Sequence, residues 1–432
     1  MRTSVLVLGL LLVACGGAGE PDGGGSGGGT SGSGGGTAGT GGGATGAGGG
    51  TTGTGGGTSG TGGGVSGTGG GTTGSGGGAT GTGGGTSGSG GGAVQPGPFY
   101  TQIGFREAVP LPPTNGADLE VDSLNRLHVL AGYSGADAGL LYSVREIDGG
   151  WTTERVAATT FSGSLELDSQ DRPHVLFFTG GTPFPPMMYA NKNTGAWVAE
   201  EVESATFQVG AGGFVVDSTG AAHAGYLIRN SVRDSGFGSY SVMYSTRAPG
   251  GGWTRERVAE TDRFTSYQPA LAVDGTNRPY VMYFDRNDAG QQQLFYGYRT
   301  APDTWQGTTF GNSSMTGSAA AVAPGDVVHL AAENNLLRFT RDAGFHSAQL
   351  GAGGGFANVM RAAADGTVWD FSRGGTSSGR NLRLGRYAAG ARQSADSGVT
   401  DVFSQGWDFD STGHPWGAVG LGDGGVSVLR LD

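Results

Sequence analysis

The sequence predicts an all-β fold: a seven-bladed β-propeller with four antiparallel strands per blade, carried behind a glycine-rich N-terminal tail. Three observations predict it. Seven related segments follow one another after residue 98, apolar and polar residues alternate within each segment, and a motif typical of the last run in a segment also occurs once ahead of the first segment. No ten-residue window has a convincing helical period, so we expect strands throughout.

The first residues, "MRTSVLVLGLLLVAC", have the pattern of an export signal: a basic residue, Arg2, precedes an apolar run that is too short to span a bilayer. Leu12 to Cys15 resembles the lipobox of bacterial lipoproteins, in which the cysteine is acylated and the preceding peptide is removed. The resemblance implies a signal peptide at 1–14 and a lipidated Cys15. Gly16 in the next position implies the outer membrane, facing the periplasm or the cell surface. The alternative is an ordinary signal peptide with a chance cysteine.

Composition argues against disulfides, cysteine-based metal sites and nucleic-acid binding. Cys15 is the only cysteine, so neither an internal disulfide nor a cysteine-based metal site is expected. The net charge is −11, Lys192 is the only lysine, and no basic run occurs. A nucleic-acid partner is therefore not expected.

Residues 15–98 form the predicted tether. From Gly27 to Ser89 the chain repeats a seven-residue unit such as GGGTSGS or GGGTTGT, with almost no large apolar side chain. Nothing in this segment can offset the entropy lost on ordering glycine, so it is expected to be a disordered, flexible linker. A period of seven with little proline excludes a collagen triple helix.

Residues 99–432 form the predicted propeller. The clearest repeats are ADLEVDSLNRLHVLAGY, GSLELDSQDRPHVLFFT, GGFVVDSTGAAHAGYLI and PALAVDGTNRPYVMYFD, and three weaker ones follow. One aromatic position marks the register, at spacings of 40 to 57 residues: His128, His174, His223, Tyr280, His329, Trp369 and Trp416.

Each repeat contains four runs at strand spacing. The first ends in aspartate before a tight polar turn, and the fourth carries W-x-x-E-x-V, as at Trp151, Trp197 and Trp253. Alternation punctuated by glycine and proline predicts four antiparallel strands. Four strands in fewer than about fifty residues, repeated in tandem, are typical of propeller blades.

The chain ends predict how the ring closes. The last repeat stops at VSVLRLD, its third run, while GFREAVP at 104–110 supplies the missing fourth run, with Glu107 and Val109 in the E-x-V positions. We expect this N-terminal strand to complete the last blade, which removes two exposed sheet edges.

The pattern D-x-x-G-x-P-H-V, then L-x-Y, then W-x-x-E-x-V, resembles propeller repeats of bacterial exported proteins grouped with sialidase-like and fucose-lectin-like propellers. The resemblance covers 99–432 and implies a fold more than a function. Sialidase Asp-boxes lie between the third and fourth strands, whereas the acidic turn here lies between the first and second, so the sialidase features do not transfer.

The repeated His and Asp residues are interpreted as structural. Tyr and Trp replace His at the marked position and cannot replace it as metal ligands, so we expect an aromatic ring packed between blades. The aspartates are expected to accept backbone N–H groups in tight turns. Asp408 to Gly413 has the start of a calcium loop, but its twelfth position is Val419 instead of glutamate, so no metal is assigned.

Ligand binding is expected on the face formed by the loops that join strands two to three and four to one. The longest such loops, in and before blades three and four, combine aromatic residues with charges, which suits a sugar or a peptide. The alternative is solvated loops with paired charges. The candidate residues are Arg229, Arg233, Asp234, Tyr240, Arg263, Phe264, Tyr267, Asp285, Arg286 and Asp288.

No catalytic constellation, cofactor site or phosphate loop is recognisable. The sequence therefore predicts a monomeric, non-catalytic recognition or scaffold module, held at the cell envelope by its lipid and binding carbohydrate or a surface protein. The alternative is a glycan-active enzyme, a glycosidase or lyase, on the same ring.

Overall fold

The computed structural model describes residues 98–432, apart from 134–137, 159, 180–184, 205–207, 231–238, 262–268, 287–290, 313–317, 333–334, 341–343, 350–355, 375–380 and 389–390. These residues belong to one compact unit, Gln95–Asp432. Cys15 and the predicted tether lie outside the described residues. No helix in the described part is long and apolar enough to cross a membrane.

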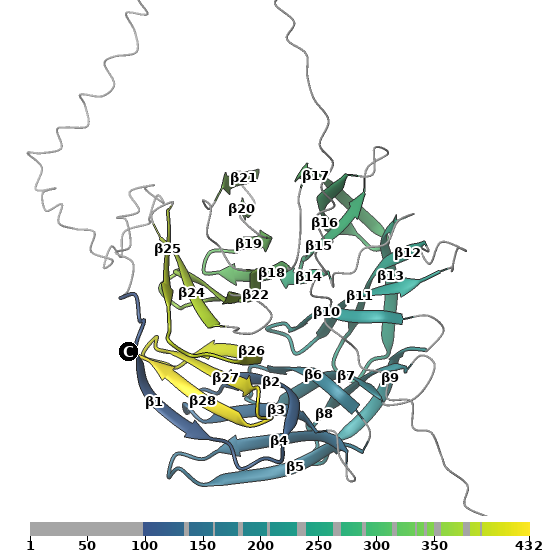
Figure 1. The fold of residues 1–432 in the computed structure, drawn as a ribbon. Coiled ribbons are helices and arrows are strands. Elements are labelled where there is room, and N and C mark those ends of the chain that lie inside the picture. The colour runs from purple at the N-terminus through teal and green to yellow at the C-terminus, as the bar shows by residue number, and fades with distance from the viewer. Residues whose placement is uncertain are drawn as a thin grey trace, which may run out of the picture. The chain divides into compact units, whose positions relative to one another are not determined.

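Seven four-stranded antiparallel sheets form the ring, and the first strand of each faces its centre (Figure 1). Blade 1 is β2(Thr114–Val121), β3(Leu127–Tyr133), β4(Gly139–Arg145) and β5(Trp151–Ala157). Blade 2 is β6(Thr160–Leu167), β7(Pro173–Thr179), β8(Met187–Asn191) and β9(Val198–Glu203). Blade 3 is β10(Gln208–Val216), β11(Ala222–Arg229), β12(Tyr240–Arg247) and β13(Trp253–Thr261).

The remaining blades have the same order. Blade 4 is β14(Ala270–Val273), β15(Pro279–Arg286), β16(Gln292–Ala301) and β17(Thr304–Asn312). Blade 5 is β18(Ser318–Ala323), β19(Val327–Ala332), β20(Asn335–Thr340) and β21(Gly344–Gln349). Blade 6 is β22(Phe356–Ala362), β23(Val368–Gly374), β24(Asn381–Ala388) and β25(Ala391–Asp396). Blade 7 is β26(Val402–Phe409), β27(Pro415–Leu421), β28(Val426–Leu431) and β1(Ile103–Ala108).

The predicted closure by the N-terminal strand is confirmed. β1 pairs antiparallel with β28, so the first strand of the chain becomes the fourth strand of the last blade. Glu107 stands opposite Val428 in this pairing. β1 and β28 thus each cover an edge of the other, although they come from opposite ends of the described chain.

The turn between the first two strands is built as the sequence predicts. In blade 1, Asp122 Oδ1 accepts the N–H groups of Leu124 and Arg126 at 2.9 and 2.7 Å. Asn125, inside this turn, has a φ of 62°, a left-handed conformation that asparagine tolerates. Asp168, Asp217, Asp274 and Asp410 accept two backbone N–H groups in the same way.

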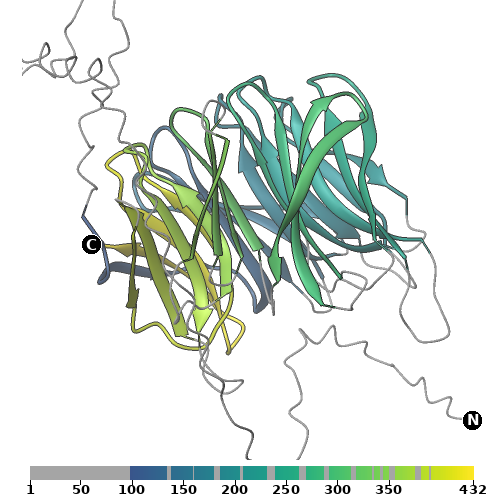
Figure 2. The same cartoon turned by 90° about the horizontal axis from the view of Figure 1, so that it is seen from above.

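Aromatic pairs join neighbouring blades, which stand face to face around the ring (Figure 2). The tyrosine of a third strand meets the tryptophan at the start of the next blade's fourth strand: Tyr142 and Trp197 lie 5.2 Å apart, centroid to centroid, at 78°. Tyr189–Trp253 and Tyr244–Trp305 repeat this contact. The L-x-Y and W-x-x-E-x-V motifs are therefore halves of one interface between blades.

Candidate functional site

Four of the predicted binding residues fall at one end of blades 3 and 4. Arg229 ends β11 opposite Tyr240, and Asp285 and Arg286 end β15. The Arg229 guanidinium lies 6.0 Å from the Tyr240 ring. Tyr240 is only 2% exposed, and burial raises the pKa of its hydroxyl, so its ring supports Arg229 and offers little free stacking surface.

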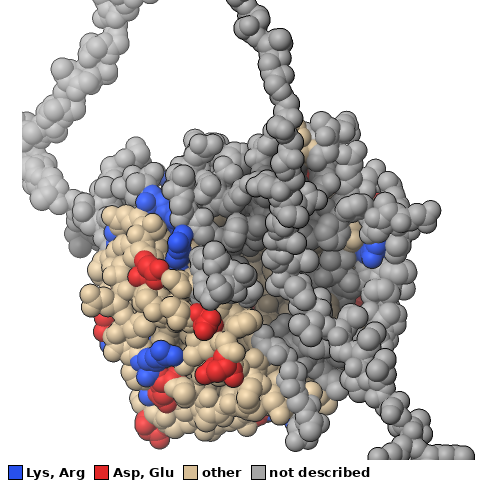
Figure 3. Space-filling model, in the orientation of Figure 1, with Lys and Arg blue, Asp and Glu red and all other residues tan. Residues whose placement is uncertain are grey.

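The other predicted contacts lie outside the described residues: Arg233, Asp234, Arg263, Phe264, Tyr267 and Asp288. Asp285 is half-buried, and Arg286 is placed by its backbone alone. The predicted loop-borne site therefore stays a prediction. On the described part of the face seen in Figure 1, acidic and basic side chains are interspersed (Figure 3).

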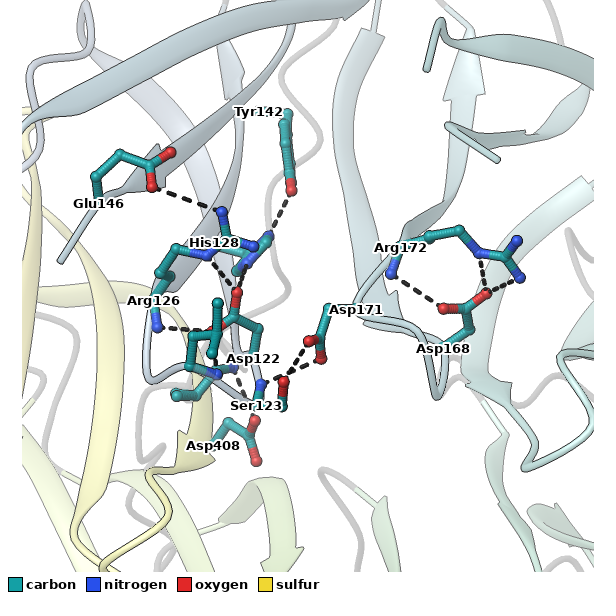
Figure 4. Close-up of polar contacts among 12 residues, drawn as sticks. Asp122, Ser123, Arg126, His128, Tyr142, Glu146, Asp168, Asp171, Arg172 and Asp408 are labelled. Carbon is teal, nitrogen blue, oxygen red and sulfur yellow. Dashed lines mark hydrogen bonds and ion pairs between the residues drawn. The ribbon is translucent and has the colours of Figure 1, made fainter. Parts of the chain in front are cut away.

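The repeated histidines are fixed inside their own blades. In blade 1, His128 Nε2 donates to Asp122 Oδ2 at 3.1 Å, and Nδ1 accepts the Tyr142 hydroxyl (Figure 4). His174 and His223 make the same pair of contacts in blades 2 and 3. In these three blades the tyrosine that the histidine contacts provides the ring contact with the next blade. At the same position in blades 4 and 6, Tyr280 packs on Phe339 of blade 5 and Trp369 on Phe409 of blade 7, as predicted. Burial lowers the pKa of His128, which keeps the imidazole neutral.

Successive blades are also tied together at these turns. The N–H of Ser123 donates to Asp171 at 3.1 Å, and that of Ser411 donates to Asn125 at 2.8 Å. Asp171 points from the blade 2 turn toward Ser123 in Figure 4. The second contact joins the last blade to the first.

Ion pairs link the outer strands of neighbouring blades, and we call this set the outer ladder: Glu107–Arg145, Glu154–Lys192, Glu200–Arg247 and Glu256–Arg299. Each glutamate comes from a fourth strand, and each base lies in or just after the next blade's third strand. Glu107 also accepts the indole N–H of Trp151 at 2.8 Å. Burial opposes ionisation of Glu107, but the hydrogen bonds from Trp151 and Arg145 outweigh it and lower its pKa.

A cavity of about 300 Å³ occupies the central channel. The inner strands of all seven blades line it. One side is charged, with Asp118, Glu166 and Arg361, whereas Phe214 and Leu271 give apolar surface elsewhere in the lining. A concave site with a few fixed polar groups beside apolar surface is the usual form of a small-ligand pocket.

Four carboxyl groups surround one guanidinium at this cavity, and we call them the channel cluster: Asp118, Glu120, Glu166, Arg361 and Asp408. Arg361 donates to Glu120 Oε1 at 2.8 Å and lies 3.8 Å from Glu166 Oε1. Asp118 and Asp408 accept backbone N–H groups, from Leu165 at 2.9 Å and Val121 at 2.8 Å respectively.

The channel cluster holds its carboxyl groups far from their ordinary acidity. Burial raises the pKa of Glu166 to about 8, although Arg361 opposes this rise. Burial and the neighbouring Glu166 raise the pKa of Glu120 well above its usual range. The pKa of Asp118 is also raised by burial, against the opposing effect of Arg361. Carboxyl groups at this cavity can therefore hold protons at neutral pH.

The sequence analysis missed these residues, although the repeat contains their signal. Glu120, Glu166, Arg361 and Asp408 each stand two residues before the turn position of their blade, and the other blades have Val215, Ala272 and Ala321 there. Glu166, Val215 and Arg361 line the cavity from this position, and Glu120 pairs with Arg361 there. Charges concentrated at one repeat position thus indicated a charged channel wall. Asp408, weighed above as the first ligand of a calcium loop, instead accepts the N–H of Val121 and interacts with the Arg361 guanidinium.

The chemistry available at the cavity is hydrogen bonding and proton exchange. Protonated and ionised carboxyl groups, together with a guanidinium, can donate to and accept from a polyhydroxylated ligand. Within the described residues, no group of three or more His, Cys, Asp and Glu side chains is placed to hold a metal ion.

Comparison with known proteins relates this chain to others by fold. No protein-family model and no curated protein matched it. A streptogramin B lyase structure has a TM-score of 0.52 at 12% identity over 76% of this chain and 98% of that one. A catalytically inactive virginiamycin B lyase from Staphylococcus aureus, with quinupristin, gives the same score and identity over 76% and 99%. At this identity the likeness shows the propeller fold alone.

Proposed function

We propose that this protein is a non-catalytic recognition module of the bacterial cell envelope that binds carbohydrate in the ring. The central cavity carries the proposal. It has the volume of a small-ligand pocket, a wall with Arg361 and carboxyl groups, and apolar surface at Phe214 and Leu271. Sugars present hydroxyl groups to such donors and acceptors, and C–H faces to apolar side chains.

The loops above blades 3 and 4 extend this proposal to a second part of the same ligand. Arg229 and Asp285 end the strands from which these loops continue, and we expect a long glycan to contact these residues as well as the channel. A surface protein that contacts only the loops is the competing partner.

Binding is tested on a glycan array with the chain carrying Cys15→Ser. We expect retention of glycans without product release. Ala320→Phe, which places a large ring in the cavity lining, should abolish retention, and Arg229→Ala should weaken it. Retention that survives Ala320→Phe and is lost in Arg229→Ala would move the site to the loops. An array on which no glycan is retained would contradict the carbohydrate proposal.

A glycan-active enzyme is the second candidate, and Glu166 favours it. A carboxyl group kept protonated near neutral pH, beside other carboxyl groups, is the pattern of a general acid in glycoside cleavage. Release of reducing ends from a retained glycan, lost in Glu166→Gln, would support this candidate over the binding module.

The proposed location of the protein at the membrane is tested separately. Wild-type chain should sediment with membranes, and Cys15→Ser should appear in the soluble fraction. A variant that stays with the membranes would contradict the lipid anchor. The control Ser26→Ala, in the tether, should behave as the wild type does.

A further inference from the structure

Arg361 connects blades that are not neighbours. It belongs to β22 in blade 6, whose ring neighbours are blades 5 and 7. Its guanidinium nevertheless donates to Glu120 of blade 1 and approaches Glu166 of blade 2 at 3.8 Å. The side chain therefore spans the channel past the inner strand of blade 7.

The same cluster holds the join between the last and the first blade. Asp408 of blade 7 accepts the N–H of Val121 in blade 1 at 2.8 Å, and Ser404 Oγ accepts that of Ala117 at 2.9 Å. β1 closes this blade from the outside by pairing with β28. The ring is thus closed twice: by β1 on its outside, and by the contacts between β26 and β2 at the channel, which we call the inner closure.

Charge is unbalanced within this inner closure. Asp118 and Glu120 from β2, Glu166 from β6 and Asp408 from β26 face the single cation from β22. The lining residues from β10, β14 and β18 are uncharged. Full ionisation would leave three uncompensated negative charges in a confined site, so bound protons relieve the repulsion. Burial raises the pKa of all four carboxyl groups, but backbone N–H groups oppose the rise at Asp118 and Asp408, so we assign the protons first to Glu120 and Glu166.

We propose that Arg361 stabilises the closed ring by pairing across the channel with blades 1 and 2. The stabilisation that it provides depends on protons held by Glu120 and Glu166. With these protons bound, Arg361 faces two neutral glutamates and two aspartates whose backbone N–H partners favour the ionised form. Loss of the protons adds like charges on blades 1 and 2, next to Asp408 of blade 7, and weakens the join that β1 closes. The contribution of the channel cluster to the stability of the ring is then largest in mildly acidic solution and falls as the pH rises.

The direction of this pH dependence follows from the linkage between proton binding and folding. The folded chain binds a proton at Glu166 up to about pH 8, whereas in the unfolded chain this glutamate ionises near its ordinary pKa of 4.5. The contribution of Glu166 to stability is therefore fully present below pH 4.5 and is lost as the pH rises toward 8. Buried neutral histidines such as His128 act in the opposite direction around their ordinary pKa, so only a comparison of variants isolates the cluster.

The test compares urea unfolding of the full chain and its Glu166→Gln variant from pH 5 to pH 9. Glutamine keeps the shape and cannot ionise. The unfolding equilibrium constant of the wild type, divided by that of Glu166→Gln, should rise by up to about tenfold per pH unit between pH 5 and 8. Glu107→Gln, the same substitution in the outer ladder, should produce no such rise.

Amide exchange locates the effect. Protection of the Val121 and Leu165 amides, corrected for intrinsic exchange rates, should fall from pH 6 to pH 9 in the wild type and fall less in Glu166→Gln. A ratio that is flat with pH would overturn the proposal. Equal exchange at these two amides in both proteins would overturn it too, because the join would then not respond to the proton.

Discussion

On the outside of the ring Glu107 has Arg145 and Trp151 as its own partners, whereas in the channel Arg361 is shared by four carboxyl groups. The shifts in pKa are opposite: that of Glu107 is lowered, and that of Glu166 is raised to about 8. Both sides pair a glutamate with an arginine. The number of cations per carboxyl group and the access to water decide whether a glutamate is ionised or protonated at neutral pH.

The largest expected effect comes from removing the shared cation. Arg361→Gln removes the cation that pairs with the buried Glu120 and lies beside the half-buried Asp118, Glu166 and Asp408. Breaking a buried ion pair costs about 3–5 kcal/mol of the free energy of unfolding. Arg145→Gln, in the outer ladder, should cost about 0.5–1 kcal/mol. Urea unfolding at pH 7 measures both variants, and equal losses would break the comparison.

A smaller effect is expected at Gly406, where blade 7 lies close to blade 1. A Cβ at Gly406 would overlap the Asp118 carboxylate and the backbone N of Leu119. Gly406→Ala should therefore cost about 1–3 kcal/mol, the usual range for overpacking. Gly252→Ala, in an open outer turn with nothing within 4 Å, should change stability by less than about 0.5 kcal/mol. If thermal unfolding shows that Gly406→Ala is tolerated equally well, the channel wall is less tightly packed than described.

The smallest expected effect is the pH dependence of the stability that Glu107 contributes on the outside of the ring. Because the pKa of Glu107 is lowered, its contribution is present above pH 4.5 and is lost as the pH falls through its folded pKa. Glu107→Gln should cost about 0.5–1 kcal/mol at pH 7 and less at pH 3. Chemical unfolding at both pH values checks this. A penalty that grows on acidification would contradict the assignment of Glu107 as an ionised residue.

Repetition explains why so much of the fold could be predicted. Asp122 and its counterparts recur at one position before a tight turn, and that spacing alone predicted hairpins that the backbone hydrogen bonds confirm. The E-x-V of Glu107 and Val109 predicted the closing strand. Glu107 also contacts Arg145 and Trp151 as Glu256 contacts Arg299 and Trp305, so this motif identified its strand correctly.

The site was harder to predict because it depends on the completed ring. Arg361 and Glu120 are 241 positions apart, and only closure of seven blades brings them within 2.8 Å. The repeat can also mislead, as His329 shows. It occupies the marked position, but Ala323 replaces the turn aspartate, its Nδ1 has no hydrogen-bond partner in the described part of the chain, and burial lowers its pKa to about 4. Equivalent positions therefore do not guarantee equivalent contacts.

The most direct measurement is infrared difference spectroscopy of the carboxyl carbonyl stretch from pH 5 to pH 9. The account predicts a band from protonated carboxyl groups at pH 7 that declines above about pH 8, is reduced in Glu166→Gln and is unchanged in Glu107→Gln. A wild-type spectrum without protonated carboxyl groups at pH 7 would contradict it, because the carboxyl groups of the channel cluster would then be ionised, as Glu107 is.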